Sequence, residues 1–231
     1  MGKHIGFLEV GTSDFNTLIQ TVSDDISGIS MEPLKFYLDN LPNRSLVKKI
    51  SAALVAEPTS NVDVYYIDPS IIDDPKNDLE DYMKGCNSVG KPHDFHTHYN
   101  KYSTGYKDEN TIIRNLVEEG LVTIKKTLAL TFSQLMGIYD LDYINTIKLD
   151  TEGQDAPLLQ SILDYYQSSG KTLPKTIEFE TNNHNKQEEL IKVAKRLISL
   201  NYILQVGDSW YNTFENFDGK FEMDCIATLN D

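Results

Sequence analysis

Residues 143–170 have the sequence YINTIKLDTEGQDAPLLQSILDYYQSSG and contain one complete transition from a strand to a helix. The run from Tyr143 to Leu149 predicts a strand that ends at Asp150. The next helix is predicted to have Asp155 as its N-cap and to end just before Gly170. Apolar residues recur between these two positions at helical spacing. This strand–turn–helix unit is the building block of an α/β fold.

The same alternation extends over most of the chain. Further strands are predicted at residues 5–10, 28–32, 50–55, 62–67, 122–130, 176–179, 202–206 and 223–229. Helices are predicted at residues 14–22, 34–41, 112–119, 131–136 and 190–198. Alternating elements predict one α/β domain over residues 1–231, with a mainly parallel sheet covered on both faces. Residues 68–108 show little periodicity, and we expect a long irregular insertion there, near the mouth of a substrate site.

The overall composition narrows the classes of function. A chain of 231 residues is long enough for one full hydrophobic core. The formal charge of −14 would repel a phosphate backbone, so nucleic acid is not expected as a partner. Cys86 and Cys225 have neither a metal-type nor a redox-type spacing. The chain shows no apolar run of membrane length and no secretory leader, so we expect a soluble, cytoplasmic protein that does not bind membranes.

Polar residues follow several of the predicted strands, where ligands bind in parallel α/β sheets. Gly11 would let the backbone turn sharply after the first strand, next to Glu9. Glu32 follows the second strand, at the spacing of a carboxylate that binds ribose hydroxyls. Asp150 and Glu152 could bind a cofactor's amino group or orient a hydroxyl. The alternatives are an ordinary turn at Gly11 and, for Glu32, a carboxylate that complements a helix dipole.

Five segments occur in the order found in the FkbM-type methyltransferase family, which the chain resembles. They are residues 7–11 (FLEVG), 31–33 (MEP), 127–135 (TLALTFSQL), 147–155 (IKLDTEGQD) and 174–180 (PKTIEFE). The similarity spans roughly residues 5 to 206. Glu9 stands where Asp is more common, and Phe15 stands where the family usually has a second glycine.

The resemblance implies a Rossmann-like class I methyltransferase fold. Such a fold has a mostly parallel seven-stranded sheet with helices on both faces and an antiparallel last strand. The resemblance also implies S-adenosylmethionine as the methyl donor. The expected reaction is methylation of a hydroxyl group on a sugar, a glycan or a sugar-bearing metabolite.

The family's functional residues can be carried over to matching positions. The residues expected to hold the cofactor are Glu9, Gly11, Thr12, Ser13, Asp14, Glu32, Ser51 and Ala52. Asp150, Glu152 and Glu180 would form a polar floor near the transferred methyl group, with Asp150 as a candidate catalytic base. Asp150 and Glu180 are also candidate ligands for a divalent metal, which the reaction could require.

Histidines supply further candidates for the base. Three of the five histidines lie between His93 and His98. His96 and His98 would point the same way on an extended loop, where they could bind a metal or accept a proton. His184 follows Glu180 closely and could also accept the proton of the hydroxyl. The alternatives are a solvated polar loop and, for His184, a polar residue at the start of a helix.

Aromatic residues are the candidates for contacts to the acceptor. Tyr99 and Tyr102 follow the histidines and could stack on a sugar ring, and Trp210 could form a wall of the acceptor pocket. The alternative is that these side chains pack against the domain. The expected partner is a small-molecule or glycan acceptor, and an oligomer is left open.

Two other functions remain open from the sequence. An NAD-type oxidoreductase would share the alternating fold and the carboxylate at Glu32, although the glycine-rich dinucleotide fingerprint is missing. A catalytically degenerate, methyltransferase-like binding module would explain Phe15. Binding of S-adenosylhomocysteine, of NAD or of neither would separate the three interpretations.

Overall fold

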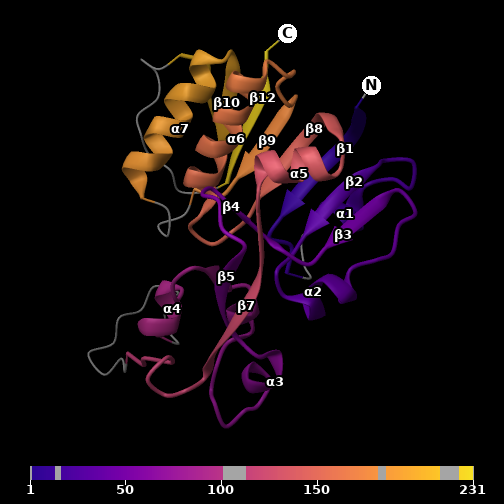
Figure 1. Cartoon of the computed structure of the whole chain (residues 1–231). Helices are drawn as coiled ribbons and strands as arrows, with labels where there is room; N and C mark the ends of the chain where they lie inside the picture. The colour runs from indigo at the N-terminus through magenta and orange to yellow at the C-terminus, as the bar shows by residue number, and fades with distance from the viewer. Residues whose placement is uncertain (1, 14–16, 101–112, 182–185, 214–223, 231) are drawn as a thin grey trace. The chain divides into compact units, whose positions relative to one another are not determined.

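The computed structural model describes residues 2–13, 17–100, 113–181, 186–213 and 224–230 (Figure 1). The chain divides into two compact units, which are described separately. The first unit comprises residues 1–60 and 128–231, and the second comprises residues 61–127. The second unit contains the insertion expected at residues 68–108 and includes further residues on both sides of it in the sequence.

The main sheet of the first unit has eight strands in the order β11-β10-β12-β9-β8-β1-β2-β3. Within the described residues these strands are β1 (Lys3–Val10), β2 (Gly28–Met31), β3 (Val47–Ile50), β8 (Leu141–Leu149), β9 (Thr176–Phe179), β10 (Tyr202–Val206), β11 (Ser209–Tyr211) and β12 (Cys225–Leu229).

Parallel pairing dominates this sheet. β3, β2, β1, β8 and β9 pair in parallel along the sheet. β12 is antiparallel to both of its neighbours, β9 and β10, so β10 has the direction of the parallel strands. β11 pairs antiparallel with β10. The prediction of a mainly parallel α/β sheet is confirmed, but the prediction of seven strands is wrong because β11 adds an eighth.

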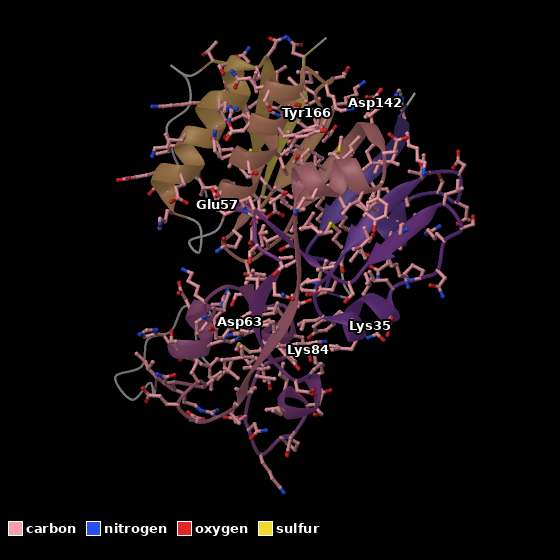
Figure 2. The ribbon with its side chains drawn as sticks, in the orientation of Figure 1. Lys35, Glu57, Asp63, Lys84, Asp142 and Tyr166 are labelled. Carbon is pink, nitrogen blue, oxygen red and sulfur yellow. The ribbon has the colours of Figure 1, made fainter. Side chains whose placement is uncertain are left out.

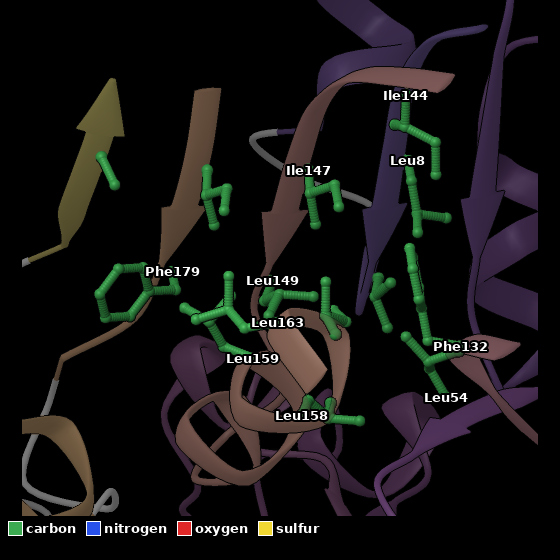
Figure 3. Close-up of a cluster of buried hydrophobic side chains, with 14 of the residues drawn as sticks. Leu8, Leu54, Phe132, Ile144, Ile147, Leu149, Leu158, Leu159, Leu163 and Phe179 are labelled. Atoms are coloured by element: carbon green, nitrogen blue, oxygen red, sulfur yellow. The ribbon is translucent and has the colours of Figure 1, made fainter. Parts of the chain in front are cut away.

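Helices cover the two faces of this sheet. They are α1 (Leu18–Thr21), α2 (Lys35–Asn40), α5 (Phe132–Ile138), α6 (Asp155–Ser169) and α7 (Gln187–Ser199). Leu8 of β1 shares a core with α5, α6 and α7, whereas its neighbour Phe7 packs with α1 and α2. Successive residues of a strand point to opposite faces, so the two helix groups lie on opposite sides. Figure 3 shows Leu149 of β8 among Leu159 and Leu163 of α6.

The order of the strands defines where a ligand would bind. From β1 the chain continues to β2 on one side, whereas β8 lies on the other side of β1. The boundary between β1 and β8 is therefore the point at which the strand order reverses. Open α/β sheets bind ligands beyond the carboxyl ends of the strands at such a switch point. Glu9 and Asp150 lie at the carboxyl ends of these two strands.

Two local predictions in the first unit are wrong. Residues 50–55 do not form one strand. β3 ends at Ile50, and β4 (Ala53–Val55) pairs instead with the end of β7 (Val122–Thr131). Asp155 is not the N-cap of α6. Gln154 has that position, and the Asp155 carboxylate accepts hydrogen bonds from the N–H and hydroxyl of Thr151.

The second unit has a small core of its own. Its elements are β5 (Asn61–Ile67), α3 (Pro69–Ile72), the 3-10 helix η1 (Asp81–Lys84), β6 (Ser88–Val89), α4 (Asp94–Thr97) and the first part of β7. Ile67, Met83 and Tyr99 are buried together in this core. Lys84, labelled in Figure 2, pairs with Asp73 and Asp81. The described part of the expected insertion therefore contains short regular elements.

The helix predicted at residues 112–119 is wrong over its described part. Residues 113–119 form turns and a single bridge, in which Arg114 pairs with Tyr99. Leu116 of this segment is buried in the core of the second unit. Among the described residues, every helix is too short or too polar to span a bilayer.

Candidate active site at the carboxyl ends of the strands

The turn after β1 brings the ends of β1 and β8 into close contact. Gly11 has a φ angle of +77°, and a Cβ atom added there would lie 1.8 Å from the carbonyl oxygen of Asp150. The N–H of Asp150 donates to the carbonyl of Val10 at 2.9 Å. Only glycine fits both this backbone conformation and this spacing. The sequence interpretation of Gly11 as the residue that allows a sharp turn is confirmed, whereas its close approach to a ligand stays a prediction.

Glu9 holds the beginning of the first helix. Its carboxylate accepts hydrogen bonds from the N–H of Leu18 at 2.5 Å and of Ile19 at 3.5 Å. The hydroxyl of Ser30 donates to the same carboxylate at 3.3 Å. Burial raises the pKa of Glu9, and these hydrogen bonds and the charge of Lys148 oppose the rise. Glu9 thus joins the end of β1 to the start of α1.

Glu32 holds the turn itself. One carboxylate oxygen accepts from the N–H groups of Thr12 and Ser13, each at 3.1 Å, and the other accepts from Leu34 at 2.8 Å. Burial raises the pKa of Glu32 to about 7, and the charge of Asp150 contributes to the rise. The sequence did not predict these bonds. Residues 12 and 13 after β1 are therefore held by the Glu32 carboxylate, and the start of α1 is held by that of Glu9.

Three carboxylates gather beyond β8 and β9. Ligand atoms of Asp150, Glu152 and Glu180 all lie within 4.8 Å of one another. Glu152 has a φ angle of +52°, in the left-handed region that non-glycine residues rarely adopt. The sequence placed these residues together as a polar floor, and the structure does bring them together.

Burial and mutual repulsion favour the protonated forms in this cluster. The pKa of Asp150 is raised to about 7 by burial and by the charge of Glu152, although Lys148 lowers it. The pKa of Glu180 is raised to about 9 by burial and by the charges of Glu152 and Asp150. A site of this kind favours a positively charged or proton-donating ligand.

Two residues of this site were not singled out from the sequence. Lys148 is buried in β8, two residues before Asp150, and its charge acts on both Glu9 and Asp150. Asp224 lies just before β12, where Cys225 pairs with Phe179, so it is opposite Glu180. Its charge raises the pKa of Glu180. Lys148 lies two residues before Asp150 in a predicted strand, so its nearness to the site could have been inferred from the sequence. The position of Asp224 depends on the antiparallel register of β12 with β9, which the sequence does not reveal.

The other cofactor candidates lie in different surroundings. Ala52 is fully buried after β3, whereas Ser51 is exposed and donates to the carbonyl of Pro33 at 3.5 Å. Asp14 lies outside the described residues. Direct contact between any of these residues and a cofactor stays a prediction.

The histidine cluster belongs to the second unit and forms a helical turn. The prediction of an extended loop there is wrong, because residues 94–97 form α4. His96 is fully buried, and burial together with His93 lowers its pKa to about 4. Its Nδ1 accepts the N–H of His93 at 3.2 Å. His98 is exposed, with its Nδ1 2.8 Å from the hydroxyl of Thr97. The two side chains therefore do not share an environment.

The aromatic candidates also differ in their surroundings. Tyr99 is buried in the core of the second unit, where its hydroxyl donates to the carbonyl of Asp78 and accepts from the N–H of Glu80. Trp210 lies on β11 of the first unit and is 61% exposed. Tyr102 and His184 lie outside the described residues.

Comparisons of the chain with models of known protein families, with curated proteins and with solved structures found no match.

Proposed function

We propose that this chain is an S-adenosylmethionine-dependent O-methyltransferase that acts on a hydroxyl group of a sugar or a sugar-bearing metabolite. The observation that carries the proposal is the set of carboxylates at the switch point. Glu9, Glu32, Asp150 and Glu180 lie at or just after the carboxyl ends of four neighbouring strands and come from four separate segments of the chain. Acidic side chains gathered at this place in an α/β sheet suit a ligand that carries hydroxyl and ammonium groups.

The topology supports the same reaction class. Apart from the three-residue β11, the sheet has seven strands, of which the last in sequence, β12, is the antiparallel one. A mostly parallel seven-stranded sheet with an antiparallel last strand is the architecture that the FkbM-type resemblance implies. Together, topology and sequence support a class I methyltransferase fold.

The residues at the switch point fit an adenosyl ligand. Gly11 allows the turn that packs the end of β1 against the end of β8, beside the proposed ligand site. Glu32 accepts three backbone hydrogen bonds, and a carboxylate can accept about four, so about one position is left for a ribose hydroxyl. Ser51 and Ala52 follow β3, in line with an adenine position.

The chemistry required of the protein is modest. S-adenosylmethionine supplies an activated methyl group, so the protein must position the acceptor hydroxyl and remove its proton. We assign the removal of this proton to Asp150, because Asp150 lies at the carboxyl end of β8 next to the switch point. Glu180, which favours its protonated form, would donate a hydrogen bond to the acceptor.

The same carboxylates fit a divalent metal. Asp150, Glu152 and Glu180 offer oxygen ligands within 4.8 Å of one another, and oxygen ligands suit Mg²⁺, Mn²⁺ or Ca²⁺. A bound ion would neutralise their repulsion and orient the acceptor hydroxyl. Assays with EDTA and with added Mg²⁺ separate a metal-assisted reaction from one that uses the carboxylates alone.

Ligand titration tests the proposed function directly. Calorimetry with S-adenosylhomocysteine should show binding, whereas NAD at the same concentrations should not. Binding of NAD alone would indicate an oxidoreductase. A well-folded protein that binds neither would be a binding module.

A substitution at Asp150 tests the assigned role. Asp150→Asn should lower the rate of methyl transfer about 100-fold or more, the scale of losing a positioned base. Asp142→Asn, at the amino end of the same strand, is the matched control and should retain the rate. Normal turnover by Asp150→Asn would remove Asp150 from the mechanism.

A further inference from the structure

A row of charged side chains crosses the centre of the sheet. Glu9 of β1 is paired in register with Lys148 of β8, and Lys148 is paired with Glu178 of β9. Residues directly opposite each other on neighbouring strands share a face, so these side chains form a ladder of alternating charge. The ladder spans the boundary between β1 and β8, directly before the acidic cluster.

Lys148 is the buried cation of this ladder. Its side chain is only 9% exposed, and its Nζ lies 3.8 Å from a carboxylate oxygen of Glu178. Its charge also favours the ionised form of Glu9, against the effect of burial. A charge is kept in such a place only when it is paired, and removal of one partner leaves the other uncompensated.

The ladder is linked to the start of α1 through Glu9. The Glu9 carboxylate accepts the N–H groups of Leu18 and Ile19, the first two residues of that helix. An ionised carboxylate accepts such bonds more strongly than a neutral one. The charge of Lys148 therefore strengthens the bonds that hold the start of α1 to the end of β1.

We propose that Lys148 is a positioning residue that keeps the carboxylate of Glu9 in place, so that Glu9 fixes the start of α1. The expected effect on cofactor binding rests on the proposed function. The effect on α1 does not, because it follows from the ladder and from the two backbone hydrogen bonds.

Four variants of the full chain test the inference: Lys148→Met, Lys148→Arg, Glu9→Gln and the double variant Lys148→Met with Glu9→Gln. Amide hydrogen exchange is measured at Leu18 and Ile19, with Leu163 of α6 as a reference in the same unit. Lys49→Met is the matched control. Lys49 is opposite Ser30 in the neighbouring strand pair, and its Nζ donates to the carbonyl of Leu41.

Lys148→Met should raise the exchange rates at Leu18 and Ile19 about tenfold or more relative to Leu163, the scale of losing a charge-assisted bond. Lys148→Arg should keep the exchange rates of both amides close to those of the wild type, because it keeps the positive charge. In the double variant, the side chain at position 9 is neutral with or without Lys148, so Lys148→Met should add no further exchange at Leu18 and Ile19 to that of Glu9→Gln alone. Lys49→Met should leave both amides unchanged.

Independent, additive effects of Lys148→Met and Glu9→Gln, or unchanged exchange in Lys148→Met, would overturn the inference. If Lys148→Met does not fold, recovery of folding in the double variant supports the inference, and failure of the double variant alongside a folded Glu9→Gln overturns it.

The dissociation constant for S-adenosylhomocysteine is measured on the same set and should rise about tenfold in Lys148→Met. Failure of the wild type to bind this ligand would refute the proposed function but leave the exchange result to decide whether Lys148 supports the start of α1.

Discussion

Glu32 of the first unit and His96 of the second unit are both buried, but burial shifts their pKa values in opposite directions. The pKa of Glu32 is raised to about 7, whereas the pKa of His96 is lowered to about 4. In both cases burial disfavours the charged form, which is the anion for one residue and the cation for the other. The two units should therefore respond to pH with opposite sign.

The two regions also differ in how their polar groups are used. The imidazoles of His93 and His96 accept N–H groups from Phe95 and His93, within their own helical turn. The carboxylates of Asp150 and Glu180 come from separate strands and lie beside one another. Local bonding accounts for the Nδ1 atoms of these two histidines. It does not explain why carboxylates that repel one another are gathered at the switch point, and that is why the proposed function is placed there.

The largest expected effect is at Gly11, where the carboxylate region depends on close backbone contact. Gly11→Ala combines a positive φ with a Cβ atom 1.8 Å from the carbonyl oxygen of Asp150, so the ends of β1 and β8 must separate. The free energy of unfolding should fall by about 3 kcal/mol or more. Urea unfolding measures it.

Gly170→Ala is the matched control for this substitution. Gly170 has a φ of +66°, but an added Cβ would meet nothing within 4 Å. Its cost should be about 1 kcal/mol, from the backbone conformation alone. Equal losses at the two glycines would show that the contact between Gly11 and Asp150 contributes little.

The pH response of the carboxylate region is tested at Glu32. Its folded-state pKa lies above the value of 4.5 that it has when unfolded. The folded state therefore binds the proton more tightly, and the stability from Glu32 is lost as pH rises from 4.5 through 7. Between pH 5.5 and 8 the free energy of unfolding should fall by about 2 kcal/mol on account of this group, at about 1.4 kcal/mol per unit.

Glu32→Gln should remove that part of the pH dependence, as measured by urea unfolding at both pH values. Glu57→Gln replaces an exposed carboxylate of the same unit (labelled in Figure 2) and should keep the wild-type slope. An unchanged slope in Glu32→Gln would mean that Glu32 titrates alike in the folded and unfolded states.

Much of the first unit could be predicted from the sequence because its signals are local. Apolar runs mark the strands around Glu9 and Lys148, and Gly170 ends α6 as expected, in a left-handed conformation. The gathering of Asp150 with Glu180 was also predictable, because parallel strands place their carboxyl ends at one edge.

The remaining features depend on contacts between distant segments. The bonds from Thr12 and Ser13 to Glu32 require a loop path that no residue pattern specifies. Asp224 joins the cluster only through the register of β12 with β9. In the second unit, the spacing of His96 and His98 suggested one shared direction, but a helical turn separates them, because His93 accepts the N–H of Phe95 and begins α4.

A smaller effect, of opposite sign, is expected at His96. Its folded-state pKa lies below the usual 6.5, so its contribution to stability is lost as pH falls below 6.5 towards 4. Hydrogen exchange at the paired amides of Tyr99 and Arg114 reports on the second unit. Between pH 8 and 5.5 their protection should weaken by about 1 kcal/mol in the wild type. His96→Phe should remove this slope while adding a constant loss for the missing acceptor of the His93 N–H. A slope that survives in His96→Phe would assign the pH response to another group.

The smallest effect is expected at His98, the exposed member of the pair. Its ring nitrogen lies 2.8 Å from the Thr97 hydroxyl at the end of α4, and its side chain is open to solvent. His98→Ala should change the stability of the second unit by no more than about 0.5 kcal/mol, because surface substitutions seldom do more. Its rate of methyl transfer should stay within about twofold of the wild type, against about 100-fold or more for Asp150→Asn. A loss at His98 as large as that at Asp150 would show that the second unit supplies the base, and the division of roles between the two regions would not hold.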